Sequence, residues 1–270
     1  MKINCAFIEK ILVSFIQTEI HRFGFRNAIL GLSGGLDSAV TACLSARALG
    51  EKNVWALLMP YGKGFRQDVD DAFEVAKELG IHTQVIDIKP MVDAFYETHP
   101  TDNRLLKGNK MARERMSILY DFSVRKKALI IGTSNKTELL LGYGTLHGDM
   151  ASALNPIGDL YKTQIREFAA HLRIPGKIIQ KTPAAGLWPD QTDEGELGMT
   201  YEVIDRVLHA LVDERRSPED LIQSGFDKET VRRIETLIKK SEFKRKLPPI
   251  AKISNRTVGH DFLYSSDRGK

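Results

Sequence analysis

The sequence has few cysteines, no strong charge of either sign and no long apolar run. Cys5 and Cys43 are its only cysteines and form no C-x-x-C pattern, which excludes a disulfide framework and a thiolate metal site. With 39 Lys and Arg against 35 Asp and Glu, charge alone favours neither a nucleic-acid nor a membrane partner. The apolar stretch 8–20 is interrupted by Glu9, Lys10, Gln17 and Glu19, so it fits neither a signal peptide nor a membrane-spanning helix. We therefore expect a cytoplasmic protein.

Apolar runs alternate with helical patterns over residues 5–172, and the residues that follow read as helices only. This alternation predicts an α/β fold, a doubly wound parallel sheet flanked by helices, with a helical C-terminal part. The expected strands are 27–32, 54–59, 85–88 and 128–132, and the expected helices are 5–22, 37–49, 68–79, 109–124, 161–172, 201–212, 218–223 and 228–240.

The most informative stretch joins the first predicted strand to the helix that follows it. It reads Gly31-Leu32-Ser33-Gly34-Gly35-Leu36-Asp37-Ser38. Glycines here let the backbone approach a ligand, and amide N–H groups at such a turn bind phosphate. The stretch is not a Walker A loop, because no Lys follows the glycines, and it is not G-x-G-x-x-G. It therefore predicts a phosphate site of another type.

Asp37 indicates how this site would work. A carboxylate beside a phosphate repels it unless a divalent cation lies between them, and Mg²⁺ is the expected cation. The alternative is that Asp37 only caps its helix and the glycines only make a tight turn. A second alternative is a serine hydrolase, because residues 31–35 also match G-x-S-x-G around Ser33. That alternative is weakened because no histidine of the sequence lies in a recognisable catalytic setting.

A second segment, Gly132-Thr133-Ser134-Asn135-Lys136-Thr137-Glu138, follows the fourth predicted strand. Open α/β folds bind ligands at the carboxyl ends of their strands, so Thr133 and Glu138 are site candidates and Glu138 is a plausible second metal ligand. The alternative is a short helix capped by Thr133 or Thr137, with Glu138 in solvent.

Three cations could supply the positive charge that the glycine loop lacks: Arg113, Arg115 and Lys162. Lys162 lies in the first turn of its predicted helix, where the dipole disfavours a cation, and this indicates an anionic partner. The alternatives are that Lys162 is an exposed surface residue and that either Arg pairs with Glu114 or Asp121 on its own helix.

The long loop 183–198 contains Asp190, Asp193, Glu194 and Glu196. Loops of this length inside compact domains are usually functional, so a lid is one interpretation. The other is a polar loop in which Asp193 and Glu196 cap a helix.

The stretch Ser33 to Ser38 resembles the S-G-G-x-D-S loop of the ATP pyrophosphatase superfamily. Three further segments are similar to ammonia-dependent NAD⁺ synthetases: GNKMARERM at 108–116, GTSNKTE at 132–138 running on to LGYGT at 141–145, and QTDEGELG at 191–198. The resemblance covers nearly the whole chain and implies one domain over residues 1–270.

The resemblance also implies roles for the matching residues. Residues 31–38 with Thr133 and Lys162 would bind ATP, Asp37 and Glu138 would hold Mg²⁺, Asp37 and Lys162 would be catalytic, and Arg113 and Lys244 would contact deamido-NAD. Some family members carry other residues where this chain has Leu146, Ala153, Ala184 and Phe243.

The implied reaction is the last step of NAD biosynthesis. The nicotinate carboxylate of deamido-NAD attacks the α-phosphate of ATP, and ammonia then displaces AMP from the NAD-adenylate. Free ammonium rather than glutamine is expected to be the nitrogen donor, and a homodimer is implied. Two rival hypotheses stay open: a serine hydrolase and a tRNA-modifying enzyme that binds RNA.

Overall fold

The computed structural model describes residues 2–184, 186–188 and 191–258. Its centre is a parallel sheet of β1 (Asn27–Gly31), β2 (Val54–Leu58), β3 (His82–Val85) and β4 (Ala128–Ile130), in the order β3-β2-β1-β4. In the register, Ile29 lies opposite Trp55 on one side and Ile130 on the other. The chain winds outward from β1 in both directions, which confirms the doubly wound sheet.

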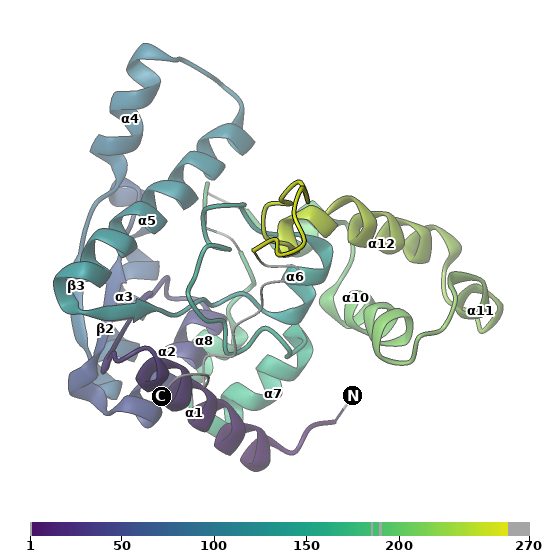
Figure 1. Cartoon of the computed structure of the whole chain (residues 1–270), viewed down its shortest axis with the longest axis horizontal. Coiled ribbons are helices and arrows are strands. Elements are labelled where there is room, and N and C mark those ends of the chain that lie inside the picture. The colour runs from purple at the N-terminus through teal and green to yellow at the C-terminus, as the bar shows by residue number, and fades with distance from the viewer. Residues whose placement is uncertain (1, 185, 189–190, 259–270) are drawn as a thin grey trace.

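Successive strand side chains point to opposite faces of the sheet. Both faces therefore carry apolar side chains, and helices cover both. Leu30 packs into a core with α1 (Cys5–Arg22), α2 (Leu36–Leu49), α3 (Arg66–Leu79), α7 (Lys162–Leu172) and α8 (Gly176–Gln180). Its neighbour Ile29 packs on the other face with α4 (Lys89–Thr98) and α5 (Arg104–Lys126). Figure 1 shows α4 and α5 apart from α1, α2 and α7.

A third core belongs to the C-terminal helices. It is built from α9 (Asp193–Leu197), α10 (Tyr201–Leu208), α11 (Pro218–Gln223) and α12 (Lys228–Lys240), with α6 (Lys136–Leu141) packed against them. A π-helical turn, His209–Asp213, ends α10. These helices lie to one side of the sheet in Figure 1, which confirms the predicted helical C-terminal part.

One strand differs from its prediction. The apolar run 85–88 was expected to be the third strand, but β3 ends at Val85 and includes the polar residues before it. β3 is the edge strand and is largely exposed, so it needs no apolar alternation. The N–H groups of Ile86 and Ile88 still donate to the carbonyls of Leu58 and Pro60. The sequence reading also missed α4.

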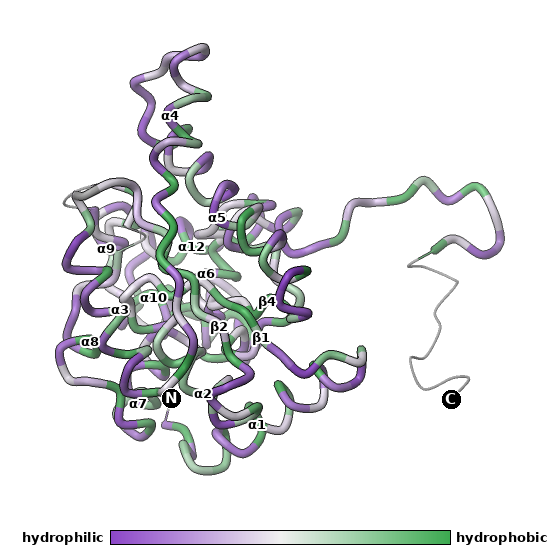
Figure 2. Tube along the Cα trace, turned by 90° about the vertical axis from the view of Figure 1, so that its left-hand side faces the viewer, coloured by the Kyte–Doolittle hydropathy of each residue, from purple (hydrophilic) through white to green (hydrophobic). Residues whose placement is uncertain are grey.

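After a short 3₁₀ turn, Glu242–Arg245, residues 246–258 run away from the body of the molecule (Figure 2). Apolar side chains along this arm are largely exposed, among them Leu247 and Ile253. Within the residues that the structure describes, no helix is long and apolar enough to cross a membrane.

Candidate functional site

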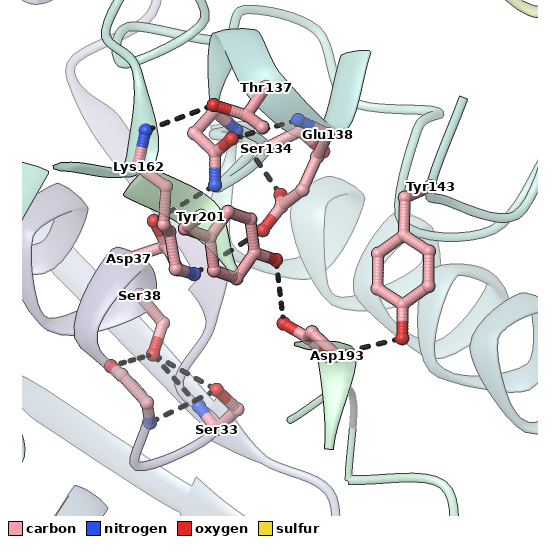
Figure 3. A network of polar contacts seen from close by, with 12 residues as sticks. Ser33, Asp37, Ser38, Ser134, Thr137, Glu138, Tyr143, Lys162, Asp193 and Tyr201 are labelled. Atoms are coloured by element: carbon pink, nitrogen blue, oxygen red, sulfur yellow. Dashed lines mark hydrogen bonds and ion pairs between the residues drawn. The ribbon is translucent and has the colours of Figure 1, made fainter. Parts of the chain in front are cut away.

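A cavity of about 560 Å³ opens at the carboxyl ends of β1, β2 and β4. Its lining brings together segments that lie far apart in the sequence: the loop after β1, Thr133 and Glu138 after β4, Lys162 at the start of α7, and Lys244. Figure 3 shows Asp37, Glu138 and Lys162 facing one another within this group. The predicted ATP and metal residues therefore lie in one place.

Ser33 and Ser38 hold the loop after β1 in shape. Their Oγ atoms lie 3.1 Å apart, the N–H of Gly35 donates to Ser33 Oγ over 3.3 Å, and Ser38 Oγ donates to the Gly35 carbonyl over 3.0 Å. Gly34 has a φ of +76°, and a Cβ there would lie 2.2 Å from the carbonyl oxygen of Asp68. Only glycine fits this turn, because it tolerates the positive φ and needs no space beside α3.

Asp37 is the second residue of α2, and the residue in the N-cap position is Gly35. The N-cap alternative for Asp37 is therefore wrong. Instead the Asp37 carboxylate pairs with Lys162 Nζ and accepts a hydrogen bond from Asn135 Nδ2 over 3.3 Å. It thus points toward the starts of α6 and α7.

Glu138 lies in the first turn of α6, which Asn135 caps, so neither Thr133 nor Thr137 is the cap. One carboxylate oxygen accepts from the Asn135 N–H over 3.3 Å, and the other lies 3.4 Å from Lys162 Nζ. Burial raises the pKa of Glu138 to about 8; Asp37 and Asp193 add to the rise, while Lys162 opposes it. Glu138 is therefore not a solvated surface acid.

Lys162 is the first residue of α7 and only 3% exposed, so the surface alternative is wrong. Its ammonium lies between the carboxylates of Asp37 and Glu138 and 5.4 Å from the centre of the Tyr201 ring. Burial alone would lower the pKa of Lys162, but the two carboxylates raise it above its ordinary value. The anionic partners inferred from its helix position are present within the chain.

The two arginines lie in different surroundings. Arg115 lines the cavity and donates from Nε to the Met59 carbonyl over 2.9 Å, and burial lowers its pKa to about 10. Arg113 is exposed, donates to the Leu146 carbonyl over 3.1 Å, and is not among the lining residues. Its role toward deamido-NAD stays a prediction.

Neither arginine pairs with an acid of its own helix. Glu114 pairs with Lys110, and Asp121 pairs with Arg125 over 2.6 Å. The intrahelical pairing considered from the sequence is therefore wrong.

Lys244 lines the cavity from the other end of the chain. Its Nζ donates to the carbonyls of Gly142 and Gly144, over 2.7 Å each. Of the four positions that depart from the family pattern, Ala184 lines the cavity, whereas Leu146, Ala153 and Phe243 are not among the lining residues.

The long loop supplies a buried carboxylate. Asp193 is 4% exposed and accepts from the hydroxyls of Tyr143 and Tyr201 over 3.1 and 2.9 Å (Figure 3). Burial raises the pKa of Asp193, while Lys162 and the two tyrosines oppose this rise. Thr192, not an acid, caps α9. Asp190 lies outside the described residues.

Lys181 was missed by the sequence reading, because no motif contains it. Its Nζ donates to the Gly34 carbonyl over 3.1 Å and pairs with Asp68 and Asp71 over 2.7 Å each. Lys181 contacts Gly34, which lies 147 positions away, and no local sequence pattern predicts such a contact.

No histidine is found among the described residues that line the cavity, so within that part of the chain no histidine base lies beside Ser33. Within the described ranges there is also no group of three His, Cys, Asp or Glu residues arranged to hold a metal ion. A cation bound between Asp37 and Glu138 would need further oxygen ligands from substrate or water.

Comparison with known proteins agrees with this geometry. The profile of the family described as NAD synthase matches residues 8–248. The NH(3)-dependent NAD(+) synthetase of Trichlorobacter lovleyi is 50% identical over 100% of this chain and 99% of its own length, and that of Chlorobaculum tepidum is 49% identical over 96% and 94%.

Two solved structures are similar over nearly their full length. NMN synthetase from Francisella tularensis has a TM-score of 0.82 and 33% identity, over 93% of this chain and 99% of that one. NH3-dependent NAD synthetase from Campylobacter jejuni, in complex with nitrate, has a TM-score of 0.80 and 37% identity, over 93% and 100%.

Proposed function

The chain belongs to the NAD synthase family of ligases, and we propose that it forms NAD⁺ from deamido-NAD, ammonia and ATP, releasing AMP and pyrophosphate. The observation that carries the proposal is the cavity in which a glycine loop at the end of β1 meets Asp37, Glu138 and Lys162. Full-length relatives named for this activity support it.

The reaction has two steps in this proposal. The nicotinate carboxylate attacks the α-phosphate of ATP, and pyrophosphate leaves. Ammonia then attacks the acyl carbon of the adenylate, and AMP leaves. Neither step needs a nucleophile from the protein, so the chain's contribution is to position the reactants and stabilise charge.

Residues 31–38, Thr133 and Lys162 bind ATP in this mechanism. The loop offers backbone N–H groups at the start of α2, and the dipole of this 14-residue helix favours the phosphates. Lys162 is buried and charged, so its interaction with a phosphate is little screened by water. The departing pyrophosphate gains negative charge that Lys162 can stabilise.

Asp37 and Glu138 fit a magnesium ion. Their carboxylates come from different helices and face the same ammonium, so their oxygens converge on one region. Mg²⁺ is commonly held by one or two carboxylates together with substrate phosphates. When bound, Mg²⁺ neutralises charge on the phosphates.

Deamido-NAD contacts Arg113 and Lys244 in this proposal, and the loop 183–198 closes over the reactants so that water does not hydrolyse the adenylate. Part of that loop lines the cavity, because Pro183, Leu187 and Trp188 are lining residues. A cytoplasmic location stays a prediction of the sequence.

We further propose a homodimer. Phe7, Ile11 and Phe15 on α1 are 60%, 48% and 38% exposed, so only part of the apolar face of this helix is buried against the body. Exposed apolar side chains gathered on one helix are typical of an interface. Light scattering should give twice the chain mass, and Ile11→Lys should shift the mass toward the monomer; a monomeric wild type would contradict the dimer.

A product assay tests the function. The purified chain is incubated with ATP, Mg²⁺, ammonium and deamido-NAD, and AMP and NAD⁺ are quantified; each reactant is omitted in turn. We expect both products in equal amounts and neither without deamido-NAD. AMP formation without NAD⁺, or no turnover at all, would contradict the proposal.

Two replacements in the same assay define the substrates. Because one similar structure is an NMN synthetase, nicotinate mononucleotide replaces deamido-NAD in one arm, and we expect slower turnover. Glutamine replaces ammonium in the other, and we expect much less product.

A further inference from the structure

A carboxylate in the C-terminal helices lies behind the site and outside the cavity lining. Asp205 on α10 is 0% exposed. One of its oxygens accepts a hydrogen bond from the Thr137 hydroxyl over 2.5 Å, and the other accepts from the backbone N–H of Thr163 over 2.8 Å. Both donors come from other helices, so Asp205 joins α10 to α6 and α7.

Thr137 continues this network to the site. Its Oγ accepts from the backbone N–H of Lys162 over 3.0 Å while it donates to Asp205. Figure 3 shows Thr137 between Glu138 and the backbone of Lys162. Glu138 is the residue after Thr137, and Lys162 is the residue before Thr163. The Asp205 carboxylate therefore fixes the first turn of α6, which carries Glu138, against the first turn of α7, which carries Lys162.

A buried carboxylate such as Asp205 is an energetically unfavourable way to hold helices together. Among the described residues its carboxylate is held by hydrogen bonds from Thr137 and Thr163, and burial raises its pKa. An apolar side chain would join the surrounding core at lower cost. What the carboxylate adds is direction, because hydrogen bonds fix the helix ends in one register whereas apolar packing tolerates sliding.

We propose that Asp205 is a positioning residue that acts through Thr137 to set the distance between Glu138 and Lys162. The proposal rests on the proposed function in so far as both residues act on ATP. A misplacement of about 1 Å within a site can lower a rate by roughly 100-fold. The network should therefore influence kcat more than binding of deamido-NAD.

Three variants test the network. Thr137→Val keeps the side-chain shape and removes the hydroxyl, whereas Thr137→Ser keeps the hydroxyl and removes the methyl group. Asp205→Asn keeps the shape and removes the charge. The control is Val231→Ala, which loosens the same core from α12, at a residue that is 0% exposed and outside the cavity lining. For each we measure kcat, KM for ATP and deamido-NAD, and the melting temperature with and without ATP and Mg²⁺.

Thr137→Val and Asp205→Asn should lower kcat by about 10- to 100-fold with little change in KM for deamido-NAD. Thr137→Ser should keep most of the wild-type kcat, and Val231→Ala should melt earlier with unchanged kcat. If Asp205→Asn does not fold, the comparison of Thr137→Val with Thr137→Ser still tests the network.

Three results would overturn the proposal: wild-type kcat in Thr137→Val, equal losses in Thr137→Val and Thr137→Ser, or an equal loss in Val231→Ala. If the wild type forms no NAD⁺, the proposed function fails, and the melting temperatures then test the positioning role of Asp205 and Thr137 without the activity assay. A stabilisation by ATP and Mg²⁺ that is lost in Thr137→Val and kept in Thr137→Ser supports the positioning role, and an equal stabilisation in both refutes it.

Discussion

One ammonium and two carboxylates face one another in the lining of the cavity. Lys162 contributes one positive charge, and Asp37 and Glu138 together contribute two negative charges when both are ionised. If ATP binds here as proposed, it brings more negative charge to the same place, so binding would require an added cation, protonation of a carboxylate, or a shift of Lys162 from the carboxylates to a phosphate. The function of these residues therefore depends on how their charges are redistributed when substrate binds.

Replacing Lys162 tests its role in this balance. Lys162→Met keeps the apolar stem and leaves two neighbouring carboxylates without their ammonium. If Lys162 acts mainly on the departing pyrophosphate, kcat should fall by at least about tenfold, roughly 1.4 kcal/mol, with a smaller change in KM for ATP. Since removal of one partner from a buried ion pair costs about 3 kcal/mol, the melting temperature should also fall.

Steady-state kinetics and a thermal melt check both expectations for Lys162→Met. The control is Lys177→Met, whose exposed side chain lies away from the cavity lining and should leave kcat unchanged. A fully active and more stable Lys162→Met would remove Lys162 from the site.

Asp37→Asn and Glu138→Gln test the metal assignment. Each removes a charge from a pair of oxygen ligands, so each should raise the Mg²⁺ concentration needed for half-maximal rate. The measurement is the rate against Mg²⁺ concentration at fixed ATP. Asp121→Asn, at an exposed acid of α5, serves as the control. An unchanged Mg²⁺ dependence in both site variants would refute the assignment.

Motifs allowed the residues of the proposed phosphate site to be named from the sequence, but the sequence could not show which residues support them. Asp37, Glu138 and Lys162 lie in segments whose composition suits phosphate chemistry, and the structure places them together. Lys181 and Asp205 act through contacts with residues more than 40 positions away, which appear only when the chain is folded.

Single loops, helices and strands also position the site. The loop after β1 turns back at Gly34, and α3 blocks any larger residue there because the Asp68 carbonyl is so close. Helix patterns were predictable because their apolar periodicity is local. β3 was misplaced by three residues because an edge strand is specified by pairing with β2 and only weakly by its own apolar pattern.

Gly34→Ala tests whether the loop needs this close approach. A Cβ would meet a backbone carbonyl that cannot move freely, so the loop should shift and ATP affinity should fall by at least about tenfold, roughly 1.4 kcal/mol. The matched control is Gly24→Ala, since Gly24 has a φ of +77° but nothing within 4 Å of its Cβ position. That control should cost only about 1 kcal/mol of stability and leave ATP affinity unchanged.

Titration calorimetry with ATP, together with thermal melts of both variants, makes this comparison. Equal ATP affinity in Gly34→Ala and wild type would show that the loop does not depend on contact with α3.

At the scale of the whole molecule, the part of the chain that the structure describes contains three apolar cores, one on each face of the sheet and one among the C-terminal helices. The third core could fold as a separate unit, but polar contacts connect it to the body. Besides Asp205, the Tyr161 hydroxyl donates to Asp213 over 2.6 Å, and Lys136 pairs with the same carboxylate over 2.7 Å. The prediction of one domain over residues 1–270 requires that these connections make the cores unfold together.

Leu221→Ala distinguishes one cooperative unit from two. Leu221 is 0% exposed in the third core, far along the chain from every sheet residue, and its truncation should cost about 3 kcal/mol. If the cores unfold together, far-UV and near-UV circular dichroism should give one coincident transition, lowered by roughly 5–10 °C in the variant. If the C-terminal helices are independent, the variant should show a new early transition while the sheet melts at the wild-type temperature. Because the Asp205 network joins α10 to both site helices, we expect the single transition, and addition of ATP with Mg²⁺ should raise it as a whole.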